Sequence, residues 1–382
     1  MICHARRLAV HAALLAGCSL AAAAQAPATA PIDFSGVMFG NWQTRSDSAA
    51  RAQTGGRNPN QFTIDRVYLT FRMPAGDRAS IRATTDIFQN AGSGWAVRLK
   101  YGYLQYDLLR DIAGRSGFNV TGRIGMLHTV VIEHEEQFWP RYLSTTGVDR
   151  FGFFSSADLG IATLVSLPGK AGEVYAHVTN GPGYAASETD RFKDVGVRLS
   201  LTPLGTHPGL FQTLAITPWV YRGRTGSKFA AGGAGQVAPV TDGLPRNRWG
   251  IFLGSRDPRL TFGVQYAKRT DGYEYGSNTV PAPRTVSDTS GTLLSTYVIA
   301  RPLSWQWGKN VSRLGVVLRR DEFRTHGELP GKEQLWIVGL EYAPTSRTAL
   351  AVDFQDLQGR DYVGRAPMTD TRTVYVHWSA AF

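Results

Sequence analysis

The segment Arg66–Met73 reads RVYLTFRM and alternates between two kinds of side chain. Val67, Leu69, Phe71 and Met73 share one face of an extended chain, and the residues between them are polar or aromatic. Successive side chains of a β-strand point to opposite faces, so this period of two predicts a strand with one apolar and one polar side. A sheet of such strands needs apolar surroundings on one face and water on the other.

The same alternation recurs along the chain and yields sixteen strand candidates. They are roughly residues 32–42, 61–73, 79–89, 95–108, 118–128, 156–167, 172–180, 192–202, 211–223, 247–256, 258–269, 291–301, 312–323, 333–343, 347–357 and 371–382. Two of them, 211–223 and 291–301, alternate poorly, so their registers stay open. Strict alternation also places Tyr101 and Tyr103 on the outward apolar face, opposite Lys100.

Short and long connections alternate between these candidates. The short ones, most of which contain Pro or Gly, are 74–78, 109–117, 168–171, 203–210, the bend at Asp257, 302–311 and 344–346. The others include long polar or Gly-rich stretches at 43–60, 129–155, 224–246 and 270–290. Transmembrane barrels combine short periplasmic turns with long extracellular loops and an even number of strands. The pattern predicts an all-β fold, a 16-stranded antiparallel transmembrane β-barrel.

The N-terminal segment indicates export. Residues 1–7 are basic, Leu8–Ala24 is an apolar run, and Ala24-Gln25-Ala26 has small residues where a signal peptidase cleaves. These features predict a secretory signal peptide over 1–26. Leu15-Ala16-Gly17-Cys18 also fits a lipobox, so lipidation of Cys18 stays open. Cleavage after Ala26 would leave a chain without cysteine, which disulfides cannot stabilise.

The last candidate strand, 371–382, ends in Phe382. This arrangement resembles the signal by which bacterial outer-membrane barrels are recognised for assembly. A soluble β-sandwich is the competing fold, but a chain of this length would be expected to split into two domains, and no linker marks a boundary. Residues 27–382 are therefore expected to form one barrel in the outer membrane of a Gram-negative-type bacterium, in contact with membrane lipid and lipopolysaccharide.

The charge balance bears on what enters the lumen. The chain carries a formal net charge of +11, and export argues against nucleic acid as the partner. Strand parity assigns nine cationic residues to the lumen: Arg66, Arg72, Arg82, Arg98, Lys100, Arg123, Arg198, Arg313 and Arg319. The same parity assigns it three carboxylates: Asp86, Glu341 and Asp353. Rings of arginine and lysine side chains inside a pore favour the passage of anions. Pairing with loop carboxylates, which would remove selectivity, is the alternative.

The 129–155 connection follows the fifth strand and is expected to fold inward as a constriction loop. It carries Glu133, Glu135, Glu136 and Arg150, and also Arg141, which joins the expected anion path. Short motifs resemble the phosphate-selective porin family: Phe34-Ser35-Gly36, Arg66-Val67-Tyr68-Leu69, Gly125-Met126-Leu127, Asn180-Gly181 and the terminal Phe382. The resemblance implies a 16-stranded homotrimer with an inward third loop. The loop lacks a lysine cluster, so phosphate is one candidate among small anions.

The expected function is passive diffusion of small hydrophilic solutes, with an anion preference. Neither HExxH nor G-x-S-x-G occurs, so the sequence predicts no catalytic residue, no metal site and no cofactor. A barrel enzyme and a structural or adhesive barrel with a closed lumen are the alternatives, and conductance in planar bilayers separates them from a channel.

Overall fold

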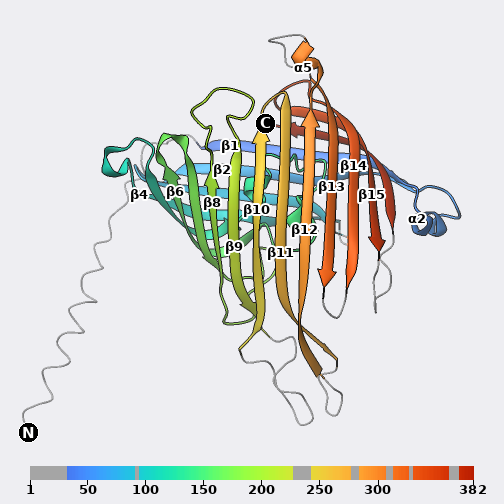
Figure 1. The fold of residues 1–382 in the computed structure, drawn as a ribbon, viewed down its shortest axis with the longest axis horizontal. Coiled ribbons are helices and arrows are strands. Elements are labelled where there is room, and N and C mark those ends of the chain that lie inside the picture. The colour runs from blue at the N-terminus through green and yellow to red at the C-terminus, as the bar shows by residue number, and fades with distance from the viewer. Residues whose placement is uncertain are drawn as a thin grey trace, which may run out of the picture.

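The computed structural model describes residues 32–90, 94–226, 242–276, 284–306, 313–326, 330–360 and 370–382. The predictions for the signal peptide at 1–26 and for Cys18 fall outside these ranges. Within them, sixteen strands form one closed barrel in which every neighbouring pair is antiparallel and β1 pairs with β16 (Figure 1). The predicted fold class is confirmed.

The strand bounds are β1 Asp33–Arg45, β2 Asn60–Pro74, β3 Ala79–Asn90, β4 Gly94–Leu109, β5 Asn119–His128, β6 Ala157–Leu167, β7 Gly172–Thr179, β8 Asp194–Leu201, β9 Ala215–Thr225, β10 Leu244–Arg256, β11 Leu260–Gly276, β12 Arg284–Ala300, β13 Leu314–His326, β14 Gly331–Tyr342, β15 Thr348–Arg360 and β16 Thr371–Ala381. The short helices are α2 Ser48–Gln53, α3 Ile132–Glu135, α4 Gly147–Arg150 and α5 Leu303–Gln306. None of the helices in the described ranges is long and apolar enough to cross a membrane.

Each predicted strand has its counterpart, and the largest differences lie where alternation is weak. The predicted strand 211–223 begins only at Ala215. β11 and β12 run well past their predicted ends and pair from Leu260–Ala300 to Gly276–Arg284, so most of the predicted connection 270–290 is strand. Backbone hydrogen bonds can extend a strand pair whatever side chains it carries. The polar residues beyond the predicted ends of β11 and β12 therefore gave no sign in the sequence that the two strands continue.

A bulge in β4 makes one facing prediction wrong. The register with β3 shifts between Thr84 and Thr85, which pair with Tyr101 and Leu99, so Lys100 is an extra residue. Lys100 and Tyr101 are both buried on the lumen side, and the phase beyond them is inverted, which also buries Tyr103. Bulges place two consecutive residues opposite one and redirect the side chains that follow.

The outward face of β13 changes character along the strand. Leu314, Val316 and Leu318 are exposed, and the next outward positions are Arg320 and Glu322. The neighbouring strands repeat the change, with apolar positions Val338, Leu340, Leu350, Val352, Phe354, Val374 and Val376 followed by polar Lys332, Gln334, Asp356, Gln358 and Arg372. An apolar band with a charged edge is what a barrel presents to hydrocarbon and headgroups.

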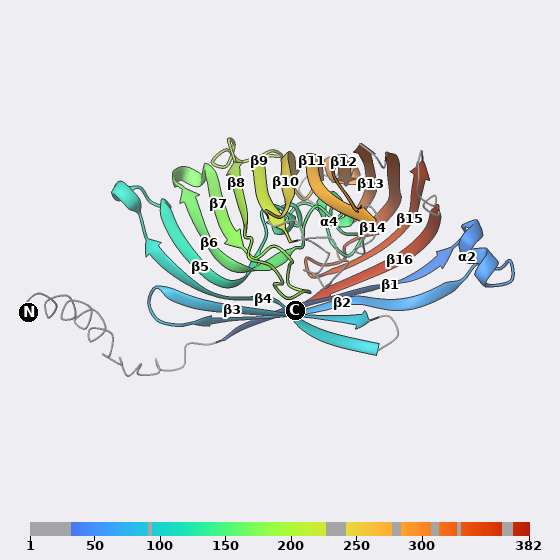
Figure 2. The ribbon, with the colours of Figure 1, turned by 90° about the horizontal axis from the view of Figure 1, so that it is seen from below.

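The interior is not empty. Figure 2 shows α4 inside the ring of strands, facing the β10–β13 side, whereas β1–β4 form a flatter wall across from it. The buried apolar side chains gather between the 129–155 segment and the inward faces of the strands. The hydrophobic core therefore lies within the lumen and occupies part of its cross-section.

Candidate functional site

The 129–155 segment packs against the β9–β14 wall. Ile132, Trp139 and Val148 are fully buried there. They belong to two clusters with wall residues that include Trp219, Phe252, Leu293, Phe323 and Ile337. A Cβ at Gly147 would lie 3.0 Å from the Ser295 Cβ, so glycine permits the close approach of α4 to β12. Apolar burial of this extent holds the segment against one side of the lumen.

Arg319 on β13 anchors the middle of the segment. Its side chain is fully buried and pairs with Asp321 at 2.7 Å. It also donates to Ser144 Oγ at 3.0 Å and to the Thr145 carbonyl at 2.8 Å, and its guanidinium lies 4.7 Å from the Trp139 ring centre. This predicted lumen residue is therefore used in holding the segment and is not free to meet a solute.

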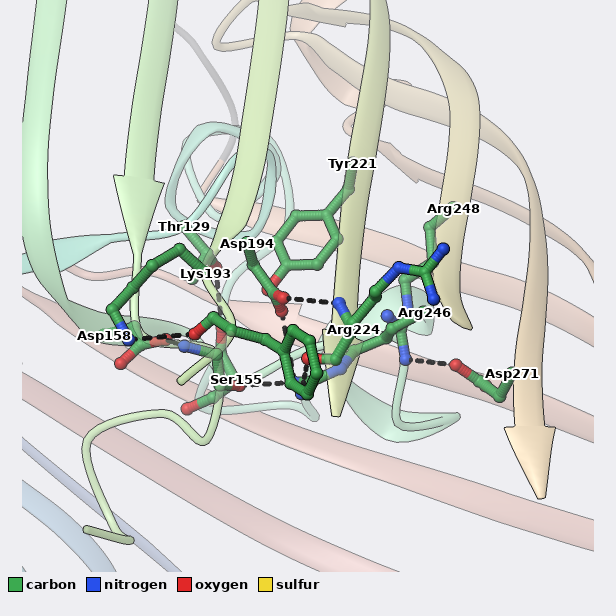
Figure 3. A network of polar contacts seen from close by, with 12 residues as sticks. Thr129, Ser155, Asp158, Lys193, Asp194, Tyr221, Arg224, Arg246, Arg248 and Asp271 are labelled. Atoms are coloured by element: carbon green, nitrogen blue, oxygen red, sulfur yellow. Dashed lines mark hydrogen bonds and ion pairs between the residues drawn. The ribbon is translucent and has the colours of Figure 1, made fainter. Parts of the chain in front are cut away.

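A polar network lies at the extracellular ends of β8–β11 (Figure 3). Asp194 is fully buried and accepts hydrogen bonds from Tyr221 Oη and from the Arg224 backbone N–H, and it lies 3.2 Å from Arg246. Arg248 pairs with Asp271 at 2.7 Å. Nearby, the Thr129 hydroxyl donates to the Ser155 carbonyl at 2.6 Å, which joins the two ends of the 129–155 segment. The Thr129–Ser155 contact closes the base of the segment, and the contacts of Asp194 and Arg248 join the neighbouring strands to one another.

Glu135 in α3 is fully buried on the wall side of the segment. Neither of its carboxylate oxygens has a hydrogen-bond partner within the described residues. Burial, and then the nearby carboxylates of Asp321 and Glu136, raise the pKa of Glu135 to about 8 despite the opposing effect of Arg319. The neighbouring His134 contacts Thr217 at 3.0 Å, and burial lowers its pKa to about 3, so it is neutral at ordinary pH.

The opposite side of the segment faces β3 and β4. Arg82 donates to Glu133 at 3.0 Å, and His128 Nδ1 lies 2.9 Å from the same carboxylate. His128 and Arg82 hold the pKa of Glu133 well below its usual range against the opposing effect of burial. Arg141 pairs with Glu136 and, at 3.1 Å, with Asp149. The predicted constriction carboxylates therefore neutralise two of the predicted anion-path arginines.

Two further predicted cations share one carboxylate. Arg98 pairs with Asp86 at 3.1 Å across β3 and β4, and Arg66 lies 3.6 Å from the same group. Both guanidinium groups also lie over the Phe88 ring, at 4.1 and 5.0 Å. The three side chains together retain one net positive charge.

Other predicted residues are spread over the lumen. Arg198 is 5% exposed, pairs with Glu173 and donates to the Val130 carbonyl at 3.1 Å, so it also supports the segment. Arg123 has no carboxylate partner in the part of the chain that is described and contacts Gln105 and His128, each at 2.9 Å. Most of the predicted lumen cations are thus paired, but among the described residues only Arg82 and Arg141 pair with carboxylates of the 129–155 loop, as the alternative raised from the sequence supposed. The other paired cations meet carboxylates on the strands themselves.

The last three predicted residues lie in three different places. Arg72 and its partner Asp33, 3.4 Å apart, are largely exposed near the turn-side ends of β2 and β1. Arg150 is the last residue of α4, within the 129–155 segment itself, and burial lowers its pKa. Arg313 was predicted inside a strand, but β13 begins only at Leu314, and Arg313 is exposed at the mouth. The alternation of faces along a strand cannot assign a side to Arg313, because this residue lies outside the hydrogen-bonded strand.

Two cavities adjoin along the free side of the segment. The larger, of about 820 Å³, lies toward the short turns, and the smaller, of about 280 Å³, lies between the segment and β1–β4. Glu136, Tyr142 and Ser379 line both. Their combined lining includes seven cationic residues: Arg82, Lys100, Arg141, Arg256, Arg301, Arg313 and Arg347. It includes four carboxylates: Glu133, Glu136, Asp257 and Glu341.

Sequence reasoning missed Arg256, Arg301 and Arg347. They lie at strand ends or in short turns, which strand parity does not assign to either face. The sequence did contain a feature that could have revealed them, because the short connections between strands repeatedly carry arginine. Within the described residues, no three His, Cys, Asp or Glu side chains come together in a group that could hold a metal ion.

The fold is similar to those of solved outer-membrane proteins. The anion-selective porin from Comamonas acidovorans is 12% identical, with a TM-score of 0.55 over 92% of this chain and 99% of that chain. The outer-membrane channel DcaP of Acinetobacter baumannii is 11% identical, with a TM-score of 0.59 over 92% and 97%. OmpT of Vibrio cholerae, in a trimer form, is 10% identical, with a TM-score of 0.56 over 92% and 99%.

At these identities the likeness establishes the fold alone. No protein-family model and no curated protein matches the sequence. The barrel is thus of the porin type found in outer-membrane proteins, whereas the resemblance to the phosphate-selective family stays a prediction.

Proposed function

We propose that the protein is a passive diffusion channel of the outer membrane for small hydrophilic solutes. The observation that carries the proposal is the pair of adjoining cavities beside the 129–155 segment, lined by charged side chains. A closed structural barrel would fill this space, and sixteen strands are enough to enclose an aqueous path. Purified protein is expected to give stepwise conductance in planar lipid bilayers. Absence of any conductance would sink the proposal.

The proposed selectivity is for anions. Seven cations against four carboxylates line the two cavities, and a charge excess beside a low-dielectric wall concentrates counter-ions. The Comamonas porin, a protein of similar fold, is described as anion-selective, which supports this proposal. Phosphate is one candidate solute. Because several of the lumen cations are paired, the preference is expected to be moderate.

Replacing Arg313 and Arg347 together by Gln is expected to reduce the anion preference. Both line the larger cavity and have no ion-pair partner within the described residues. Loss of two charges near the path should lower the anion-to-cation permeability ratio roughly twofold. The measurement is the reversal potential under a KCl gradient, and Arg110→Gln, at an exposed turn residue outside both cavities, is the matched control. An unchanged reversal potential in the double variant removes these residues from the path.

The proposed assembly is a homotrimer in outer-membrane lipid and lipopolysaccharide. A solved structure of similar fold is described as a trimer form, and the flatter β1–β4 wall offers a broad surface for a neighbour (Figure 2). Mass measurement of the detergent complex tests this proposal. We favour a channel over a barrel enzyme. Several of the charged groups at the lumen cavities are held in ion pairs, and no nucleophile–base arrangement occurs among the described residues that line the cavities.

A further inference from the structure

The smaller cavity has an unusual combination of walls. Val37, Phe39, Tyr68, Tyr101 and Tyr142 give it aliphatic and aromatic sides. Its volume of about 280 Å³ lies just below the usual range for ligand sites, which begins at about 300 Å³, so it suits only a small ligand. The inverted phase after the β4 bulge creates this surface, because the bulge turns both Lys100 and Tyr101 toward the lumen. We call it the Lys100 cavity.

Lys100 brings one uncompensated charge to the cavity. The residue is 3% exposed, and no carboxylate lies within ion-pair distance of its ammonium in the described part of the chain. The ammonium lies 4.3 Å from the Tyr68 ring centre and 5.4 Å from that of Tyr101. Aromatic rings offset part of the cost of desolvating a cation, but a buried ammonium is better served by an anion.

The other two cations at the Lys100 cavity already have partners. Arg82 pairs with Glu133, and Arg141 pairs with Glu136 and Asp149. An entering anion therefore meets one free positive charge. Glu133 and Glu136 also line the cavity and would repel a second negative charge on the same ligand.

Hydrogen-bond donors accompany the charge. The hydroxyl groups of Tyr68 and Tyr101 are buried, and neither has a partner within the described residues. Buried hydroxyls are normally satisfied, so two unpartnered phenols beside one ammonium leave donor capacity for an acceptor. A carboxylate has two oxygens and can accept from the ammonium and from a phenol together.

From these observations we propose that the Lys100 cavity is a binding site for small monocarboxylates with a planar aromatic body. The carboxylate meets Lys100 and the phenol hydroxyls, and the ring packs between the aromatic walls. A dianion such as hydrogen phosphate fits poorly, because it has no apolar part and because Glu133 and Glu136 oppose its second charge. The proposal deepens the proposed channel function and supplies a solute class for it.

Benzoate is the probe, and binding to the detergent-folded protein is measured by saturation-transfer NMR. Saturation of the benzoate ring protons is expected, at millimolar concentration, for the wild type and for Lys332→Met, a matched loss of a lumen-remote lysine that pairs with Glu322. Lys100→Met is expected to weaken binding about tenfold, since a charge-assisted contact is lost. Benzamide, which has the same ring without the charge, is expected to bind as weakly to the wild type as benzoate binds to K100M.

A second variant keeps the proposal testable if K100M does not fold. Tyr68→Phe combined with Tyr101→Phe keeps the charge and both rings but removes the hydroxyls, and it is expected to weaken benzoate binding several-fold. Equal binding to wild type and K100M, or displacement of benzoate by phosphate at equal concentration, would overturn the proposal. Bilayer recordings distinguish failure of this binding site from failure of the channel proposal. Conductance without benzoate binding refutes the binding site, and benzoate binding without conductance refutes the channel.

Discussion

Replacing Arg319 by Met is expected to lower the free energy of unfolding by about 3–5 kcal/mol, because removing one partner of a buried ion pair leaves the other charge uncompensated. Asp321 would remain fully buried without its partner. The Ser144 hydroxyl and the Thr145 carbonyl would lose the donor that ties the 129–155 segment to β13. Met keeps much of the length that packs against Trp139, so the loss reports the charge and its hydrogen bonds.

Guanidinium-induced unfolding in detergent micelles, followed by tryptophan fluorescence, measures the change. Arg320→Met is the matched control, since Arg320 is the next residue, is 47% exposed on its side chain and pairs with Glu322 at the outer surface. Exposed pairs contribute about 0–1 kcal/mol. R319M, unlike R320M, should also give larger and noisier single-channel currents, because the segment loses an anchor. Similar effects of both substitutions would contradict the assigned role.

The strands were predictable because lipid imposes a simple rule on each of them. An outward side chain in hydrocarbon must be apolar whatever its neighbours are, so the alternation in Arg66–Met73 or along β13 is a local property of the sequence. The ends of β11 and β12 were not predictable in the same way. They extend beyond the apolar band, where nothing requires alternation and only the backbone ladder continues.

The sequence indicates which charged residues face the lumen, but it does not indicate which of them pair with one another. Parity places Arg98 and Asp86 on the same face, yet their pairing depends on the register between β3 and β4. Arg82 meets Glu133 only because the 129–155 segment crosses the lumen at that height. By contrast, Arg319 and Asp321 are two residues apart on one strand, so their contact could have been inferred from the sequence.

The β4 bulge shows a further limit. Leu99-Lys100-Tyr101 contains no Gly or Pro to mark an extra residue, and Tyr101 suits a lipid-facing position as well as a lumen wall. Only the pairing of Leu99 and Tyr101 with adjacent residues of β3 reveals the insertion. Since the Lys100 cavity depends on that inversion, its character was beyond what the sequence pattern indicates.

Replacing Glu135 by Gln is expected to stabilise the protein at neutral pH and to remove much of the pH dependence of its stability. The pKa of Glu135 in the folded protein is raised to about 8 from an ordinary 4.5, first of all by burial. Between these two values the folded protein retains a proton that the unfolded chain releases, so the free energy of unfolding falls as pH rises through this window. At pH 7 the cost is about 3 kcal/mol, from about 1.4 kcal/mol per unit. Gln has the same shape and never ionises.

Unfolding midpoints of wild type and E135Q at pH 4, 5.5, 7 and 8.5 measure this difference. The two proteins should be nearly equal at the lowest pH and diverge as pH rises, with E135Q the more stable. Glu188→Gln provides a control of opposite sign: hydrogen bonds from the Asp190 N–H and Lys193 outweigh the opposing effect of burial and lower the pKa of Glu188, so its ionised form is the stabilising one. E188Q should therefore lose a little stability at neutral pH. Parallel pH curves for wild type and E135Q would mean that Glu135 is solvated, and that the 129–155 segment does not bury it against the wall.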